Sequence, residues 1–205
     1  MIEEKAVFSP PNGAHLVLAS SSPRRRELFK QMGISGFSIQ AADIDERVLA
    51  RELPPAYALR IAKKKAEKVS KQNENSFVLA ADTVVACGRR IMPKAETEAE
   101  ANSCLNLLSG RRHKVLGAVV IYSPNGTQIY RVVKSVVTFK KLTSEEINFY
   151  LKTREWEGKA GGYAIQGLAA AYIRALNGSY SNVVGLPLYE TYQMLKGMGF
   201  KHKVP

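Results

Sequence analysis

The residues with the clearest capacity for chemistry form a run of hydroxyl and guanidinium side chains near the N-terminus. The run reads Ser20, Ser21, Ser22, Pro23, Arg24, Arg25 and Arg26. Hydroxyls, guanidiniums and the free amides of a helix N-terminus all bind phosphate oxygens, so this run suits a polyphosphate ligand. Three arginines in a first helical turn oppose the helix dipole, which favours the ligand interpretation. Position alone supports equally well the alternative of a capped surface helix with solvated arginines, and the opposed dipole is what favours the ligand.

A single carboxylate interrupts an apolar run further along the chain. Asp82, followed by Thr83, lies inside the segment SFVLAADTVVA at 76–86. A carboxylate in so apolar a strand destabilises the fold unless it has a partner. We favour a metal ligand or general base at the lip of a sheet over an aspartate at a strand end that faces a turn.

Three weaker candidates accompany these. Clustered carboxylates at Asp43, Asp45 and Glu46 could hold Mg²⁺ beside a phosphate, although a solvated loop is the commoner explanation. Gln166 lies between two glycine positions and could read a base edge with its amide, or simply end a strand before a turn. Lys94 follows a predicted strand end and is weak evidence by itself.

Lys65 differs from the other lysines of its helix. The helix is predicted to begin near Pro55, and Lys65 falls on its apolar stripe. The stripe consists of Ala58, Ala62, Ala66 and Val69, and the remaining basic residues of the helix are Arg60, Lys63, Lys64, Lys68 and Lys71. We expect most of these to form a solvated face, whereas Lys65 either snorkels or reaches into a site.

The elements that must position these residues alternate irregularly. Strands are predicted at 15–19, 37–41, 76–86, 112–122, 128–139, 170–176 and 179–184, with the Asn177-Gly178 turn between the last two. Helices are predicted from Pro23 and Pro55, after the capping boxes that begin at Thr97 and Thr143, and from Leu188. The pattern predicts a mixed α/β fold, with one compact unit of two lobes around a cleft. Residues 1–14 are expected to be a loose tail.

Composition bounds the class of partner. The chain has 205 residues, and 30 Lys and Arg oppose 18 Asp and Glu, for a net charge of +12. This balance indicates a polyanionic partner: nucleic acid, an acidic membrane, or a phosphorylated small ligand. No apolar run approaches the roughly 20 residues of a membrane span, and residues 1–15 do not resemble a signal peptide. We therefore expect a cytoplasmic protein without a membrane partner.

Common cofactor motifs are missing. The sequence contains neither G-x-x-x-x-G-K-[ST] nor a G-x-G-x-x-G after a strand, which argues against a P-loop NTPase and a Rossmann dehydrogenase. Cys87 and Cys104 do not make a disulfide framework. The three histidines lack neighbours at zinc-ligand spacing.

Several of these segments, taken in order, resemble one family. These segments are LASSSPRRRELF, Asp45-Glu46, Ala62 to Ala66, AADTVV, GYAIQG and NGSYSNVVGLPLYET, and the resemblance covers nearly all of the chain from about residue 16 to 197. The chain resembles the Maf family of nucleoside triphosphate pyrophosphatases. The resemblance implies hydrolysis of a triphosphate to the monophosphate and pyrophosphate, with a divalent cation, Mg²⁺ or Mn²⁺. It also implies a Maf/ITPase-like elongated mixed sheet flanked by helices, two lobes around a central cleft, and often a homodimer.

The resemblance assigns roles to particular positions. It makes Asp82 the proton acceptor and Arg24, Thr83 and Gln166 the selectivity set. Gln166 is similar to the dTTP/UTP branch, whereas the 7-methyl-GTP branch usually has glutamate there. Glu46, Lys65 and Lys94 match further site residues, although Pro93-Lys94-Ala95 stands where the family usually has Gly-Lys-Pro.

The resulting hypothesis is a house-cleaning hydrolase of dTTP, UTP and modified pyrimidine nucleotides, with one catalytic domain at 15–200. Asp82 and Glu46 would hold the metal, and Thr83 and Gln166 would contact the pyrimidine. The phosphates would contact Ser20, Ser22, Arg24, Arg25, Lys65 and Lys94. The alternatives are a non-catalytic cell-division regulator and a nucleic-acid-binding protein. The helix around Lys63–Lys71 disfavours nucleic acid because it lacks interleaved aromatic residues.

Overall fold

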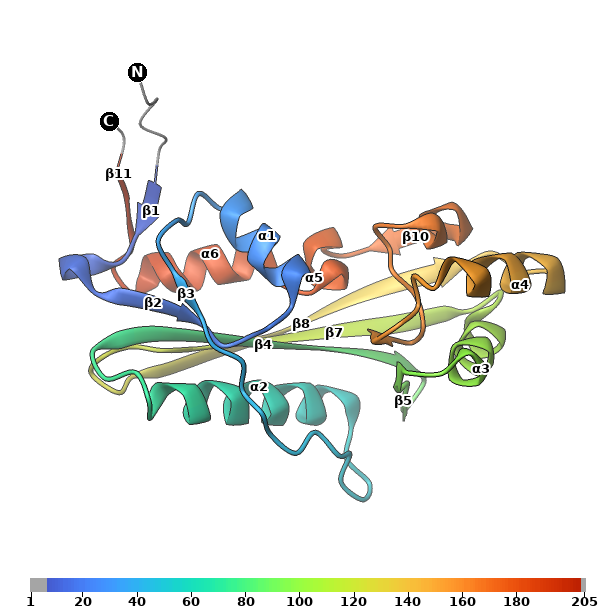
Figure 1. Cartoon of the computed structure of the whole chain (residues 1–205), viewed down its shortest axis with the longest axis horizontal. Helices are drawn as coiled ribbons and strands as arrows, with labels where there is room; N and C mark the ends of the chain where they lie inside the picture. The colour runs from blue at the N-terminus through green and yellow to red at the C-terminus, as the bar shows by residue number, and fades with distance from the viewer. Residues whose placement is uncertain (1–6, 204–205) are drawn as a thin grey trace.

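The computed structural model of the chain describes residues 7–203 and centres on one seven-stranded sheet (Figure 1). Its strands are β2 (His15–Leu18), β3 (Ser38–Ile39), β4 (Ser76–Cys87), β5 (Arg90–Ile91), β7 (Arg112–Tyr122), β8 (Gln128–Phe139) and β10 (Ile173–Asn177). Their order is β10-β8-β7-β4-β2-β3, and β5 also pairs with β4. β2 is parallel to β3 and β4, whereas the remaining pairs are antiparallel. This confirms the mixed α/β class.

Three long strands form the centre of the sheet. Their β-branched residues suit a pleated, buried surface. β4, β7 and β8 pair along nearly their whole length and extend across both lobes (Figure 1). Helix α2 (Pro54–Ser70) covers one face with Ile61, Ala62 and Val69, which pack in one cluster with Val78 and Val120. Helices α1 (Pro23–Gln31), α5 (Tyr180–Val184) and α6 (Leu188–Gly197) lie on the opposite face.

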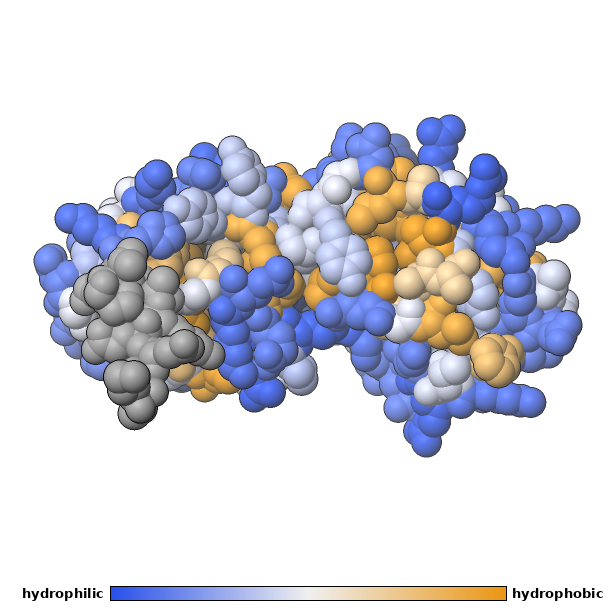
Figure 2. All heavy atoms as spheres, turned by 90° about the horizontal axis from the view of Figure 1, so that it is seen from above, coloured by the Kyte–Doolittle hydropathy of each residue, from blue (hydrophilic) through white to orange (hydrophobic). Residues whose placement is uncertain are grey.

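The second lobe is built on the far end of the long strands. It contains α3 (Glu98–Leu108), α4 (Ser144–Thr153), the short 3₁₀ helix η2 (Leu168–Tyr172) and the two-stranded pair of β6 (Lys94–Ala95) with β9 (Lys159–Ala160). Both predicted capping boxes are present, at Thr97 with Glu100 and at Thr143 with Glu146. Viewed from the side of α1 and α6, the molecule narrows between the two lobes (Figure 2).

Two predictions about secondary structure near the C-terminus are wrong. The predicted strand at 170–176 begins as η2 and becomes β10 only at Ile173, and the predicted strand at 179–184 is helix α5. The helix is favoured for two reasons. Ser179 caps it, because its hydroxyl accepts a hydrogen bond from the Asn182 amide, and a helical turn buries Asn182 against the sheet. A strand would lose this contact.

The predicted loose tail is also incorrect over its described part. The 3₁₀ turn η1 (Pro11–Gly13) follows β1 (Val7–Ser9), which pairs with β11 (Lys201–Lys203). Phe8 is buried and stacks on Tyr192. Residues 1–6 of the predicted tail lie outside the described residues. Within 7–203, no helix has the length and hydrophobicity needed to cross a membrane.

Candidate active site

The candidate site lies where the sheet loses a strand. β2 pairs with β4 only as far as Leu79, after which the chain turns through Ser20–Ser22 into α1. β4 continues to Cys87, and β5 joins it only at Ala86. In the described chain, no strand pairs with residues 80–85 on this side. The carboxyl ends of parallel strands are common ligand sites, and a cavity of about 700 Å³ opens here.

Ten of the residues that the sequence singled out as site candidates line this cavity, whereas Arg26, Asp43 and Asp45 are exposed outside it. The ten are Ser20, Ser22, Arg24, Arg25, Glu46, Lys65, Asp82, Thr83, Lys94 and Gln166. The volume falls in the range of small-molecule sites, about 300–1,000 Å³. Residues more than 140 positions apart in the chain therefore meet around one space of nucleotide size.

A chain of four alternating charges lies on the α2 side of β4. Asp82 is 3% exposed, and its Oδ1 accepts a hydrogen bond from Lys65 Nζ at 2.8 Å. The same ammonium lies 2.7 Å from Glu46 Oε1, and Lys94 Nζ lies 2.6 Å from Glu46 Oε2. Lys65 therefore reaches into the site rather than snorkelling. The partner of the buried aspartate is the lysine that broke the apolar stripe.

Glu46 is fixed although it belongs to an irregular loop. Burial alone raises its pKa, but hydrogen bonds from Lys65 and Lys94 outweigh this and bring the pKa to about 2. The Tyr57 hydroxyl donates to the Glu46 carbonyl at 2.8 Å. Burial, followed by the nearby carboxylates Asp82 and Glu46, raises the pKa of Tyr57 to about 12. The loop is thus anchored through both the main chain and the side chain of Glu46.

The other side of β4 presents a different kind of contact. Thr83 points away from Asp82, and its hydroxyl accepts from Arg25 Nη2 at 3.2 Å. Arg25 also donates to Ser20 Oγ at 3.2 Å and to the Gly185 carbonyl at 2.9 Å. Burial lowers the pKa of Arg25, although Asp82 opposes that shift. The acceptors around this guanidinium are therefore all neutral.

A second pair of cations lies nearer the second lobe. Burial lowers the pKa of Arg24, and its Nε is buried without a hydrogen-bond partner among residues 7–203. Burial and then the charge of Arg24 lower the pKa of Lys159. Gln166 is exposed at the cavity wall, and its amide makes no hydrogen bond within the described chain. Lys159 Nζ donates to the Glu157 carbonyl at 2.8 Å. Arg24 and Gln166 are therefore the groups at this end that offer a ligand donors without a partner in the described chain.

Ser20, rather than Ser22, holds the turn that precedes α1. Ser22 occupies the N-cap position of α1, but its side chain makes no capping hydrogen bond. Instead the Ser22 amide donates a hydrogen bond to Ser20 Oγ at 3.2 Å, and the same oxygen accepts a second hydrogen bond from the Arg25 guanidinium. Ser20, which is buried, therefore organises the serine turn.

Sequence reasoning missed the residues that support the site from behind. Asn182 is fully buried and donates to Val115 O, Val133 O and Ser135 Oγ, which fixes α5 and hence Gly185. A Cβ on Gly117 would meet Asn182 Oδ1 at 1.9 Å. Gly117, an interruption in an apolar strand, was therefore a usable signal. Lys159, Tyr57 and Glu155 carried no comparable signal.

The donor set can be tested against a divalent cation. Asp82 and Glu46 face a common point, since both contact Lys65 Nζ. Among residues 7–203, no group of three or more Asp, Glu, His or Cys could hold an ion by itself. Mg²⁺ typically takes one or two carboxylates and completes its shell with phosphate oxygens and water. The pair therefore fits a cation that arrives with a phosphorylated ligand.

Comparison with known proteins gives consistent matches. The family model described as Maf-like protein matches residues 15–198. A dTTP/UTP pyrophosphatase of Paramagnetospirillum magneticum is 55% identical over 91% of this chain and 98% of its own. A dTTP/UTP pyrophosphatase of Caulobacter vibrioides is 52% identical over 92% and 98%. A nucleoside triphosphate pyrophosphatase of Ehrlichia canis is 50% identical over 88% and 94%.

Solved structures match more distantly. The structure of a HAM1 protein from Coxiella burnetii covers 90% of this chain and 99% of that chain, with a TM-score of 0.49 and 14% identity. A likeness at that level has no bearing on function.

Proposed function

The chain belongs to the Maf family, and on that premise we propose that it is a pyrophosphatase of dTTP, UTP and related modified pyrimidine triphosphates. Water attacks the α-phosphorus, the bond to the bridging oxygen of the α–β anhydride breaks, and pyrophosphate leaves. The products are the nucleoside monophosphate and pyrophosphate. Such an enzyme removes unwanted triphosphates from the nucleotide pool, which is a house-cleaning role.

Asp82 is the residue we assign to the attacking water. Its buried carboxylate stands at the open edge of β4, inside the cavity. An ordinary aspartate has a pKa of about 3.9 and is a weak base at neutral pH. A divalent cation, Mg²⁺ or Mn²⁺, held by Asp82 and Glu46 together with the phosphates would supply charge neutralisation and a more acidic water. Asp82 itself orients the attacking water and accepts its proton.

The cations of the cavity are assigned to the phosphates. Phosphoryl transfer depends mainly on positioning and on stabilisation of charge. Arg24 and Arg25 have no carboxylate partner among residues 7–203, so their guanidiniums are available to an anion. Lys65 and Lys94 contact Glu46 and would share their protons with phosphate oxygens when the substrate binds. Ser20 and Ser22 offer hydroxyl and amide donors from the turn before α1.

Thr83 and Gln166 are assigned to the pyrimidine. The Gln166 amide can donate and accept at the same time, which matches the adjacent carbonyl and N–H of uracil and thymine. The Gln166 side chain has no hydrogen-bond partner among residues 7–203, which supports this role. The single observation that carries the proposal is the buried Asp82–Lys65 pair at the open edge of β4, in a cavity of nucleotide size.

Three further assignments accompany the function. We propose that the catalytic unit spans residues 15–200, that it acts in the cytoplasm, and that it assembles as a homodimer. A cell-division role without catalysis and nucleic-acid binding are the rival functions. Both predict that pyrophosphate release is absent.

The test is a panel of triphosphates. The purified protein is incubated with UTP, dTTP, CTP, the purine triphosphates and modified pyrimidine triphosphates, each with Mg²⁺ or Mn²⁺, and pyrophosphate release is measured. We expect the highest kcat/KM for UTP and dTTP and no release after chelation of the metal. A salt-sensitive gel shift with nucleic acid, without release of pyrophosphate from any triphosphate, would support the rival and overturn the proposal.

A further inference from the structure

The turn that carries Gln166 is held at both of its ends by one neighbouring segment. At one end, the Ala164 amide donates to the Tyr150 hydroxyl at 3.1 Å. At the other end, the Leu168 amide donates to Glu155 Oε2 at 2.8 Å. Tyr150 belongs to α4, and Glu155 follows directly after it. The Gln166 side chain, which lies between these two bonds, makes no hydrogen bond to the part of the chain that the structure describes, so the backbone is fixed while the side chain is available to a ligand.

The contact between Glu155 and the turn is close. A Cβ placed on Gly167 would lie 2.0 Å from Glu155 Oε2 and 2.7 Å from Oε1. The carboxylate therefore lies directly against the Gly167 backbone. Gly167 has φ −109° and ψ −154°, an extended conformation open to any residue. An alanine at this position would therefore have to displace the Glu155 carboxylate, and backbone strain would play no part.

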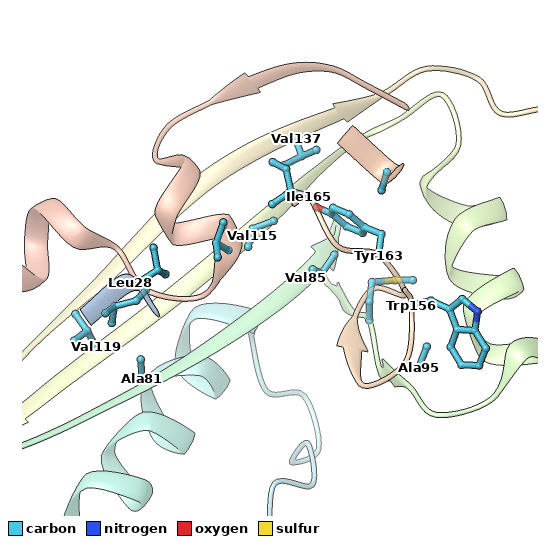
Figure 3. Close-up of a cluster of buried hydrophobic side chains, with 14 of the residues drawn as sticks. Leu28, Ala81, Val85, Ala95, Val115, Val119, Val137, Trp156, Tyr163 and Ile165 are labelled. Carbon is cyan, nitrogen blue, oxygen red and sulfur yellow. The ribbon is translucent and has the colours of Figure 1, made fainter. Parts of the chain in front are cut away.

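The segment that presents Glu155 is itself rigid. The Glu155 amide donates to Thr153 Oγ1 at 3.2 Å, and the Trp156 indole donates to the Leu151 carbonyl at 2.8 Å. Trp156 is 5% exposed. Figure 3 shows Trp156 beside the segment that carries Tyr163 and Ile165, whose side chains lie near Val85 and Val115 of the sheet. Both partners of the contact are therefore anchored in the core of the second lobe.

The charge of Glu155 needs an explanation of its own. The residue lines the cavity in which we place a triphosphate, yet a carboxylate there repels that ligand. A positioning role resolves this conflict, because a carboxylate is a strong acceptor for a backbone amide.

We propose that Glu155 is a positioning residue for base selectivity, and that Glu155 and Tyr150 together clamp the turn from Ala164 to Leu168. The proposal rests on the proposed function, in which Gln166 contacts the pyrimidine. The clamp sets the position of the Gln166 backbone before the nucleotide arrives. Loss of the clamp should lower the discrimination between nucleotide bases. Every group assigned to the phosphates or to the attacking water would remain in place.

Two substitutions break the same contact from opposite sides. Glu155→Ala removes the acceptor, and Gly167→Ala displaces the carboxylate by steric contact. Glu155→Gln keeps an acceptor oxygen and serves as the conservative variant. Glu157→Ala is the matched control, since this substitution removes the same charge from the same segment, and among residues 7–203 the Glu157 side chain pairs only with the exposed Arg154.

The measurement is kcat/KM for UTP and for CTP, by pyrophosphate release. A small misplacement of a substrate-contacting group can lower the rate by about a hundredfold. For Glu155→Ala and Gly167→Ala we expect the ratio of kcat/KM for UTP to kcat/KM for CTP to fall about tenfold, because kcat/KM for UTP decreases. Glu155→Gln and Glu157→Ala should keep the ratio within about threefold of the wild type. If Glu155 had a merely structural role, kcat/KM would fall equally for both nucleotides.

Amide hydrogen exchange separates this proposal from the proposed function. Exchange at Leu168 should become faster in Glu155→Ala than in the wild type and the Glu157→Ala control, whether or not the protein hydrolyses nucleotides. A wild-type protein without pyrophosphatase activity would overturn the proposed function, and unchanged Leu168 exchange would overturn the clamp. An active wild type whose UTP-to-CTP ratio survives both Glu155→Ala and Gly167→Ala would overturn the selectivity role.

Discussion

The two sides of strand β4 hold their polar groups in different ways. Asp82 and Thr83 are neighbours in sequence, and their side chains point to opposite faces of the sheet. On the Asp82 side, Lys65 and Lys94 are already compensated by Asp82 and Glu46. On the Thr83 side, Arg25 is surrounded by neutral acceptors and keeps its full charge for a ligand.

This difference separates two tasks. Compensated charges on the Asp82 side are fixed in place before the substrate arrives, which suits the reacting centre. Uncompensated guanidiniums on the Thr83 side suit the capture of an anion. Substitutions on the Asp82 side should therefore affect kcat most, and substitutions on the Thr83 side should affect KM and the choice of base.

Among substitutions of the residues around Asp82, Lys65→Met should have the largest effect. It leaves the carboxylates of Asp82 and Glu46 without their shared cation, and removal of one partner of a buried pair costs about 3–5 kcal/mol. We expect kcat for UTP to fall at least about a hundredfold, with a lower unfolding midpoint. Steady-state kinetics and thermal unfolding measure the two effects. A folded variant with wild-type kcat would remove Lys65 from the reacting side.

Arg24→Ala should act mainly on KM. Arg24 has a buried Nε without a partner in the described chain, so its truncation leaves no protein group stranded. We expect KM for UTP to rise about tenfold or more, with a smaller change in kcat. The exposed Arg26 offers a control, since Arg26→Ala removes the same charge from the same helix. An equal rise of KM in both variants would show that the net charge of the protein, and not a specific contact of Arg24, accounts for the effect.

Gln166→Glu should change selectivity more than overall activity. A carboxylate keeps the acceptors but loses the amide donors, so the contact with uracil and thymine weakens. We expect kcat/KM for UTP and dTTP to fall about tenfold relative to the other nucleotides. The triphosphate panel measures this directly, and a uniform loss across all nucleotides would contradict the selectivity role.

His113 gives the smallest effect, and it concerns stability. Its side chain faces the same side of the sheet as Thr83 but lies in the second lobe, where burial lowers its pKa to about 4 from 6.5. The unfolded chain therefore binds more protons between these values. Stability should fall as the pH drops from 6.5 towards 4, by at most about 1.4 kcal/mol per pH unit from this group.

His113→Phe should remove this part of the pH dependence. Urea unfolding of the variant and the wild type at several pH values between 4 and 7 measures the difference. The wild type should lose more stability than the variant over that window. Parallel curves for the two proteins would show that His113 does not titrate with a lowered pKa in the folded state.

The sequence could predict those features in which a residue differs in type from its neighbours or in which the signal lies within a short segment. Asp82 and Lys65 were visible because each is a charged residue in an apolar pattern, and the structure pairs them with each other. Both capping boxes were visible because their signal spans only four residues. Where an element depends on a distant partner, the prediction failed. β1 needs β11 from the far end of the chain, and α5 needs a buried place for Asn182.

Glu155 shows the limit of the same reasoning. It stands in the charged segment REWEGK, where one more glutamate offers no contrast. Its contact with Leu168 is set by the path of the chain after α4 and becomes visible only in three dimensions.

The most direct test of the division between the two sides of β4 uses Asp82→Asn. The variant keeps the size of the side chain, and Lys65 keeps Glu46 as a charged partner at 2.7 Å, so the fold should be retained. Two quantities are measured: pyrophosphate release from UTP, and the affinities for UTP and CTP by calorimetry with Mg²⁺. We predict turnover lower by at least about a thousandfold, with the wild-type preference for UTP over CTP retained in binding. Near-wild-type turnover, or loss of the preference together with turnover, would contradict the account.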